Sequence, residues 1–310
     1  MLNLSLKKGR TMKAKRRTKG GLTAFLLVTV LLTGLFLYGV INARTVRVVY
    51  GEVKLKNLDY RLDGVKILYL SDLNISSASE AEHAARLVER LSALKPDIIL
   101  IGGDITDTDL LCTVRQLLGI STSQQESDNL LSARDLFLRR IDELHVPGGI
   151  LAVTGESDLP LTDMEKSRHN VFFLEDSGVN VTLNGAVLPV YGGRSAAFNL
   201  SGSGVSPMII MFHDPRLYGS AALRASERNS EPGSYLMLSG HLLEGQIRIG
   251  GLHLYEDALC EQFPTDKNGV YSDGSGMKML IGSGIGAKTL PVRIGTAPKA
   301  YLITLRASRT

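Results

Sequence analysis

Five short apolar segments, each followed at once by a turn that carries an acidic residue or a histidine, constrain this 310-residue chain most. An uninterrupted apolar run is typical of a strand that is buried on both faces. The loops at the carboxyl ends of such strands meet at one edge of the sheet, where ligands bind. The segments and the polar residues that follow them are Ile67–Leu70 with Asp72, Ile98–Ile101 with Asp104, Ile150–Val153 with Glu156 and Asp158, Met208–Phe212 with His213, and Leu236–Leu238 with His241.

Any one of these turns is weak evidence, because an aspartate after a strand is commonly a turn former or a helix cap. Several carboxylates at one sheet edge repel one another unless a cation lies among them. The repeated pattern therefore predicts a divalent metal centre. The two cysteines, Cys112 and Cys260, are too few for a disulfide scaffold or a Cys-rich zinc module, and the sequence leaves open whether they pair.

Helices are expected in the first half of the chain and strands in the second. Residues 79–94 have an apolar helical face, and Ser79 with Glu82 predicts a capping box at its start. A second helix is expected near residues 130–144, after a polar surface loop over residues 121–129. From residue 171 strands dominate, with turns at Asn184-Gly185, Gly192-Gly193 and Gly250-Gly251. This order favours mixed sheets with helices outside them, in one domain.

An uncharged segment over residues 22–41 precedes these elements. Twenty residues at ~1.5 Å each span the ~30 Å hydrocarbon core of a bilayer. The segment exceeds the roughly 7–15 apolar residues of a cleaved signal peptide. A twin-arginine signal at Arg16-Arg17, a cleaved N-terminus and a buried soluble helix are the alternatives.

The charge distribution predicts how the chain is oriented in the membrane and argues against one class of partner. Residues 1–20 carry eight basic and no acidic side chains, so the rest of the chain has a net charge of −4 although the whole carries +4. The positive-inside rule predicts a basic cytoplasmic tail over residues 1–21, a single transmembrane helix over residues 22–41 in the cell membrane, and an extracytoplasmic domain over residues 45–310. An acidic domain gives no electrostatic reason to expect nucleic-acid binding.

The strand-end motifs resemble, in order and kind, those of the calcineurin-like metallophosphoesterases, especially their membrane-anchored bacterial branch. The resemblance runs from about residue 64 to the C-terminus. It implies an α/β fold, namely an αββα sandwich of two mixed β-sheets flanked by helices. The motifs are Ser71-Asp72-Leu73, Gly103-Asp104-Ile105-Thr106-Asp107, Gly155-Glu156-Ser157-Asp158, His213-Asp214-Pro215 and Gly240-His241-Leu242-Leu243-Glu244-Gly245-Gln246-Ile247.

Two metal ions share a bridging aspartate in that family, and Asp104 takes its position here. The first ion is also held by the counterpart of Asp72 and by two histidines. The two histidine positions hold Asn74 and Leu243 in this chain. The neighbouring Glu244 is a candidate oxygen ligand in place of Leu243.

The resemblance places Asp104, His213 and His241 around the second ion, together with Glu156 where the family has asparagine. Such a set of imidazoles and carboxylates suits Mn, Zn, Fe or Mg, and one ion is favoured over two. Ser157 stands where the family has its proton-donating histidine, so the catalytic acid is unknown.

Four further residues are candidates for roles around this centre. His253 is a candidate replacement ligand, although a polar position on a strand face is the favoured interpretation. Arg194 is a candidate phosphate-binding residue. Asp107 and Asp158 are expected to act as caps or hydrogen-bond acceptors rather than ligands.

The predicted function is metal-dependent hydrolysis of a phosphoester, weakened because Asn74, Leu243 and Ser157 replace histidines and Glu156 adds negative charge. The alternative is a non-catalytic protein of the same fold that binds a ligand of the cell envelope. The sequence does not indicate the substrate.

Overall fold

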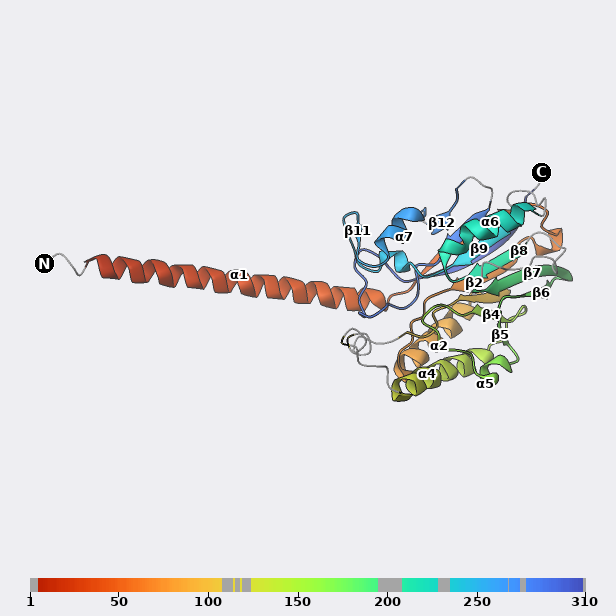
Figure 1. Cartoon of the computed structure of the whole chain (residues 1–310), viewed down its shortest axis with the longest axis horizontal. Coiled ribbons are helices and arrows are strands. Elements are labelled where there is room, and N and C mark those ends of the chain that lie inside the picture. Colours follow the sequence, from red (N-terminus) through yellow and green to blue (C-terminus); the bar gives the residue numbers. More distant parts are fainter. Residues whose placement is uncertain are drawn as a thin grey trace.

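Two six-stranded mixed sheets lie face to face in the computed structural model of the chain, with helices on their outer faces (Figure 1). The structure describes residues 5–107, 114, 118, 124–194, 208–227, 235–266, 268–273 and 277–308. This arrangement confirms the predicted αββα sandwich. Cys112 lies outside the described residues.

The first sheet is built around four parallel strands, β2 to β5, and β14 runs antiparallel to β2. At one edge of the sheet, β1 pairs in parallel with β14. The strand nearest the C-terminus therefore lies between β1 and β2. The strand order is β1 (Arg47–Leu55), β14 (Lys299–Ala307), β2 (Lys66–Leu70), β3 (Ile98–Gly102), β4 (Ile150–Val153) and β5 (Val171–Phe173).

The second sheet also has a parallel centre, made of β13, β9, β8 and β7, with an antiparallel strand at each edge. Its strand order is β12 (Val270–Tyr271), β13 (Lys278–Ile281), β9 (Tyr235–Ser239), β8 (Met208–Phe212), β7 (Ala186–Gly193) and β6 (Ser177–Leu183). A small separate hairpin consists of β10 (Arg248–Ile249) and β11 (Leu252–His253).

The helices cover the outer faces of the sheets. The first sheet is covered by α2 (Ala78–Ser92), α4 (Gln124–Asp142) and the short α5 (Asp163–Lys166), and the second by α6 (Tyr218–Glu227) and α7 (Asp257–Gln262) (Figure 1). The described residues also include the 3-10 turns η1 (Tyr60–Leu62), η3 (Pro215–Leu217) and η4 (Leu243–Gly245). The layers explain why central strands such as β3 and β9 are buried along their whole length, since both faces of the sheet are covered there.

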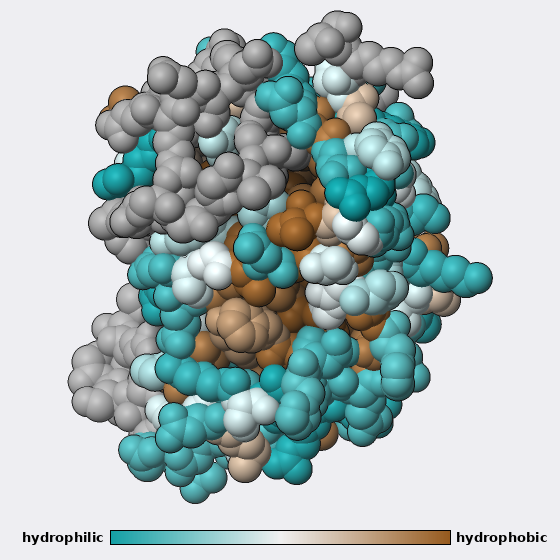
Figure 2. Space-filling view, turned by 90° about the vertical axis from the view of Figure 1, so that its right-hand side faces the viewer, coloured by the Kyte–Doolittle hydropathy of each residue, from teal (hydrophilic) through white to brown (hydrophobic). Residues whose placement is uncertain are grey.

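Alternate residues of each strand belong to different apolar clusters. In β2, Ile67 and Tyr69 face the second sheet, whereas Leu68 and Leu70 pack with the helices. In β8, Ile209 contributes to the cluster between the sheets and Phe212 to the one under α6. Viewed from the side away from the long N-terminal helix, apolar residues run along the middle of the molecule between polar surfaces (Figure 2).

A single long helix, α1 (Ser5–Ala43), extends away from the sandwich (Figure 1). Residues Gly21–Ala43 of this helix are long and apolar enough to cross a membrane. Its last turns contact the segment around Arg293: the Arg293 amide donates to Gly39 O at 3.0 Å, and Asn42 Nδ2 donates to Arg293 O at 3.0 Å and to Thr296 O at 2.6 Å. The end of α1 is therefore bonded to the domain.

The guanidinium of Arg293 fixes the loops beside this contact. It is fully buried and donates to the carbonyl oxygens of Leu243 and Ser283, both at 2.7 Å, and to Gly286 O. Burial lowers the pKa of Arg293 to about 10. Three backbone carbonyls thus solvate a buried cation and hold two loops at a fixed spacing.

Three local predictions from the sequence were wrong. The helix predicted from Ser79 is capped by Ser77, whose side chain accepts from Glu80 N, and Glu80 in turn accepts from the amide and hydroxyl of Ser76. The same Ser-x-x-Glu spacing occurs twice, at Ser77-Glu80 and Ser79-Glu82, and the backbone becomes extended at Ser77. The N-cap consequently lies two residues earlier, and the helix runs from Ala78 to Ser92.

The second helix begins at Gln124, so residues 124–129 are helical rather than a loop. Side-chain hydrogen bonds between residues four apart, Gln124 with Asp128 and Gln125 with Asn129, support this exposed polar turn. The pair Gly192-Gly193 ends β7 instead of forming a turn. A Cβ at Gly192 would lie 2.7 Å from Val153 Cγ1, so close packing requires this glycine.

The capping assignment gives a direct test. Ser77→Ala is expected to destabilise the protein by about 1 kcal/mol, because it removes the acceptor for the Glu80 amide. Ser79→Ala is the matched control and should not destabilise it, since Ser79 lies inside the helix. Urea denaturation of the full chain in detergent measures both. Equal losses from the two variants would contradict the assignment.

Candidate metal centre

The strand-end residues predicted from the sequence come together at one edge of the sandwich. Asp72, Asp104 and His213 form one group whose ligand atoms lie within 4.8 Å of one another. Glu156, His213 and His241 form a second such group. His213 is shared, so the two groups make one continuous cluster with donors from both sheets. Asp72 and Asp104 follow strands of the first sheet, and His213 and His241 follow strands of the second.

Glycines next to these residues make the close approach possible. A Cβ at Gly103 would lie 2.8 Å from His213 Nδ1, one at Gly155 would lie 2.1 Å from Asp104 Oδ1, and one at Gly240 would lie 2.5 Å from Asp72 Oδ2. Gly103 also has a φ of +89°, which favours glycine. The glycines that precede Asp104, Glu156 and His241 in the sequence are thus a packing requirement of the cluster.

The backbone at the cluster adopts the left-handed region at non-glycine residues. Asp72, Asn74 and Asp104 have φ values of +49°, +49° and +48°, and His241 has +73°. Such a conformation costs of order 1–3 kcal/mol at each residue and persists where the surrounding structure fixes it. Here it directs the side chains of successive strand ends toward one point.

Hydrogen bonds orient both histidines. His213 Nδ1 lies 2.7 Å from Gly102 O, and a carbonyl only accepts, so Nδ1 carries the proton and Nε2 faces the carboxylates. Nε2 lies 3.0 Å from Glu156 Oε2 and 3.4 Å from Asp104 Oδ2. His241 Nδ1 lies 2.7 Å from Glu156 Oε1.

The acidic surroundings shift the ionisation of these groups. Burial alone would lower the pKa of His213, but its contacts with Asp104 and Glu156 and the charge of Asp72 outweigh burial and raise the pKa well above its usual value. Burial raises the pKa of Asp72. For Glu156, the contacts with His213 and His241 outweigh the opposing effect of burial and lower the pKa. The cluster therefore attracts positive charge strongly.

Lys288 supplies part of that positive charge, and sequence reasoning missed it. Its Nζ lies 3.3 Å from Asp104 Oδ2 and 3.0 Å from Glu156 Oε1. Burial alone would lower the pKa of Lys288, but the charges of Asp104 and Glu156 help to raise it. Gln246 fixes the backbone of Lys288 by accepting from its amide and donating to its carbonyl, both at 2.9 Å. Lys288 lies in the irregular segment between β13 and β14, outside every strand-end motif quoted from the sequence, so that pattern carries no signal for it.

One acidic residue and one serine hold the loops of the cluster in place. Asp158 is buried and accepts from the amides of Gly155 and Thr106, at 2.9 Å each, and from Ile105 N, which agrees with its predicted role as an acceptor. Ser157, at the position of the family's proton donor, donates from its amide at 3.0 Å and its hydroxyl at 3.1 Å to Asp104. Its observed contacts thus orient Asp104.

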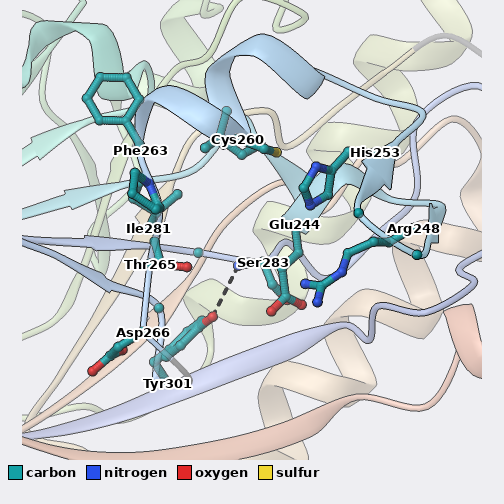
Figure 3. A pocket seen from close by; sticks show the side chains of 16 residues that line it. Glu244, Arg248, His253, Cys260, Phe263, Thr265, Asp266, Ile281, Ser283 and Tyr301 are labelled. Atoms are coloured by element: carbon teal, nitrogen blue, oxygen red, sulfur yellow. Dashed lines mark hydrogen bonds between the residues drawn. The ribbon is translucent and has the colours of Figure 1, made fainter.

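Three other candidates lie elsewhere. Glu244 pairs with Lys299 Nζ at 2.5 Å, and Leu243 is fully buried beside it. His253 lines a separate pocket of about 380 Å³ together with Glu244 and Cys260 (Figure 3). Arg194 is exposed and follows β7, whose Gly193 pairs with Phe212, so it lies on the same sheet edge one strand from His213. Its amide donates to Asp176 Oδ1.

Several buried atoms of the cluster fit a metal ion. Asp72 Oδ2, His213 Nε2 and both polar atoms of the Asn74 amide have no properly directed hydrogen bond among the described residues. Buried polar atoms are nearly always satisfied, and oxygen and imidazole donors are the usual ligands of divalent ions. Lys288 already neutralises part of the charge of Asp104 and Glu156. The buried atoms without a hydrogen bond therefore lie mainly around Asp72.

The fold and this cluster define an α/β sandwich with a candidate divalent-metal centre at the junction of its sheets. No family model matches the chain. The Bacillus subtilis protein "Uncharacterized protein YpbG" is 23% identical over 233 residues, covering 71% of this chain and 74% of that protein. A zebrafish (Danio rerio) "Transmembrane protein with metallophosphoesterase domain" is 25% identical over 242 residues, covering 74% of this chain and 52% of that protein.

A Caenorhabditis elegans protein with metallophosphoesterase in its name is 25% identical over 216 residues, covering 63% of this chain and 40% of that protein. Two of the three distant relatives are therefore named for metallophosphoesterase, and their names support that family for this chain. With the Asp, Glu and His cluster, they suggest a divalent metal. The chain spans about half or less of these two relatives.

Proposed function

We propose that this protein is a membrane-anchored metallophosphoesterase that hydrolyses a phosphoester at a degenerate centre with weakened activity. The observation that carries the proposal is the convergence of Asp72, Asp104, Glu156, His213 and His241, with buried donor atoms that lack hydrogen bonds. The relatives named for metallophosphoesterase support the reaction class.

The residues of the chain would act in three ways. Asp72, Asn74, Asp104, Glu156, His213 and His241 would hold one divalent ion, Mn, Zn, Fe or Mg. When bound, such an ion polarises a phosphoryl oxygen and activates water. Ser157 and Asp158 orient the ligand loops, and Lys288 and Arg194 are the cations near this edge that can attract a phosphate.

The anchor is part of the same proposal. Residues 22–41 would span the cell membrane, with the basic residues 1–21 in the cytoplasm and the domain over residues 45–310 outside it. The apolar helix over Gly21–Ala43 supports this arrangement, as does the zebrafish relative named a transmembrane protein.

Metal content and turnover test the proposal together. The full chain in detergent is expected to bind about one Mn²⁺ and to hydrolyse generic phosphomonoesters or phosphodiesters slowly. Asp104→Ala and His241→Ala should lose both metal and turnover, whereas His145→Ala, a histidine in the loop before β4, should keep both. Absence of bound metal near neutral pH would reject the centre, and turnover that survives both ligand variants would reject its role.

A second candidate function is a non-catalytic protein of the same fold that binds a cell-envelope ligand. Lys288 favours it, because an ammonium within 3.3 Å of Asp104 and 3.0 Å of Glu156 already balances carboxylates that would otherwise need an ion. Leu243 and Ser157, in place of histidines, point the same way. Metal-dependent turnover abolished by Asp104→Ala would exclude this candidate.

A further inference from the structure

The β10–β11 hairpin presents apolar side chains to solvent. Ile249, Leu252 and Leu254 are 59%, 54% and 60% exposed. The strand register pairs Ile249 with Leu252 and Arg248 with His253, so the two pairs lie on opposite faces of the hairpin. Arg248 and His253 line the pocket drawn in Figure 3, which leaves the apolar pair without cover among the described residues.

This hairpin is joined directly to the segment that holds α1. The amide of Arg248 donates to Ile294 O at 2.7 Å, and Ile247 forms a parallel bridge with Ile294. The preceding residue, Arg293, donates to Gly39 O. Figure 1 shows β11 on the side of the domain from which α1 leaves.

The contact between the domain and α1 indicates at which height along the membrane-spanning helix the hairpin lies. Gly39 precedes the end of the apolar span at Ala43 by four residues, which correspond to about 6 Å along a helix. The domain therefore contacts α1 inside the apolar span rather than beyond it. A Cβ at Gly39 would lie 3.1 Å from both Val292 Cβ and Ile294 Cγ1, so the two parts are tightly packed there.

The composition of the hairpin suits an anionic bilayer surface. Residues 246–255 include one arginine, one histidine and no acidic residue. Apolar side chains beside basic ones are typical of segments that lie in the headgroup region. A bilayer that covers these half-exposed side chains removes their apolar surface from water, which is favourable.

We propose that the β10–β11 hairpin inserts Ile249, Leu252 and Leu254 into the outer surface of the membrane that α1 spans, and so holds the domain against the bilayer. The proposal rests on the anchor proposed above. The hairpin would be a second membrane contact, on the same side of the domain as α1. The domain then does not rotate freely at the end of α1.

Tryptophan fluorescence tests this directly, because the chain contains no Trp. Leu252→Trp and Leu254→Trp probe the hairpin, and Phe36→Trp, within the apolar part of α1, reports on the anchor. Phe172→Trp is the matched control: Phe172 is 50% exposed on β5, the edge strand of the first sheet farthest from β1. Each full-length variant is reconstituted into phosphatidylcholine and phosphatidylglycerol vesicles, with and without dibrominated acyl chains.

We expect the brominated lipid to quench about half or more of the emission of the Phe36→Trp, Leu252→Trp and Leu254→Trp variants and to leave Phe172→Trp unchanged. Quenching of Phe36→Trp without quenching of either hairpin variant would overturn the proposal while keeping the anchor. In that case, protection of the hairpin probes from acrylamide would assign the surface to another protein or a second copy. An unquenched Phe36→Trp variant would reject the anchor itself, whatever the hairpin probes report.

Discussion

Arg134→Met is expected to destabilise the protein by about 3–5 kcal/mol, because it leaves a buried carboxylate without its partner. Arg134 and Glu165 are both 1% exposed and form a bidentate pair, with Nε to Oε1 at 2.6 Å and Nη2 to Oε2 at 2.9 Å. The same guanidinium donates to the carbonyls of Leu159 and Pro160. It thereby ties α4 to the loop between Glu156 and α5.

Urea denaturation of the full chain in detergent measures this loss. Lys166→Met is the control, because the Lys166–Glu175 pair is exposed and solvent screens its charges, so its loss should change the stability little. The double variant Arg134→Met with Glu165→Gln should recover part of the stability, since the uncompensated charge is removed. If the single variant loses no more than the control, the buried pair does not stabilise the fold.

Lys288→Met is expected to tighten the binding of Mn²⁺ by about 10–100-fold. Two unit charges about 4 Å apart interact by about 4 kcal/mol at an effective dielectric constant of 20, and the partial exposure of Lys288 reduces this value. Its ammonium lies within that distance of both Asp104 and Glu156, so it competes with a metal ion for their charge. Without this ammonium, the carboxylates of Asp104 and Glu156 are available to the metal ion.

Titration calorimetry on the full chain in detergent checks this prediction. Lys299→Met removes a cation of the same kind that pairs with Glu244 outside the cluster, and it should leave the affinity unchanged. The thermal stabilisation by Mn²⁺ should also increase in Lys288→Met alone. Equal or weaker metal binding in that variant would mean that Lys288 holds the carboxylates in place for the ion rather than competing with it.

The sequence predicted the sandwich and the cluster because both depend on short local patterns. Apolar runs such as Ile98–Ile101 identify central strands, and parallel strands bring the residues after them, such as Asp104 and His213, to one sheet edge. The positions of these side chains follow from topology alone.

The features that the sequence did not predict depend on contacts between distant residues, or on which of two equivalent local patterns is used. The spacing Ser-x-x-Glu occurs at two overlapping registers, and the extended backbone at Ser77 selects the first. Lys288 reaches the cluster from an irregular segment whose path is fixed by Gln246, a contact 42 residues distant along the chain. Glu244 is directed away from the cluster by Lys299, which lies on the last strand.

The hydrogen bonds between α1 and the residues around Arg293 link two regions that a flexible linker would have separated. Arg293 and Thr296 accept from Asn42, and Lys288 is only five residues before Arg293. A vertical displacement or a rotation of α1 would therefore pull on the backbone that carries the ammonium beside Asp104. In the membrane-anchored arrangement proposed above, bilayer thickness and tension would have a short mechanical route to the charge balance of the cluster.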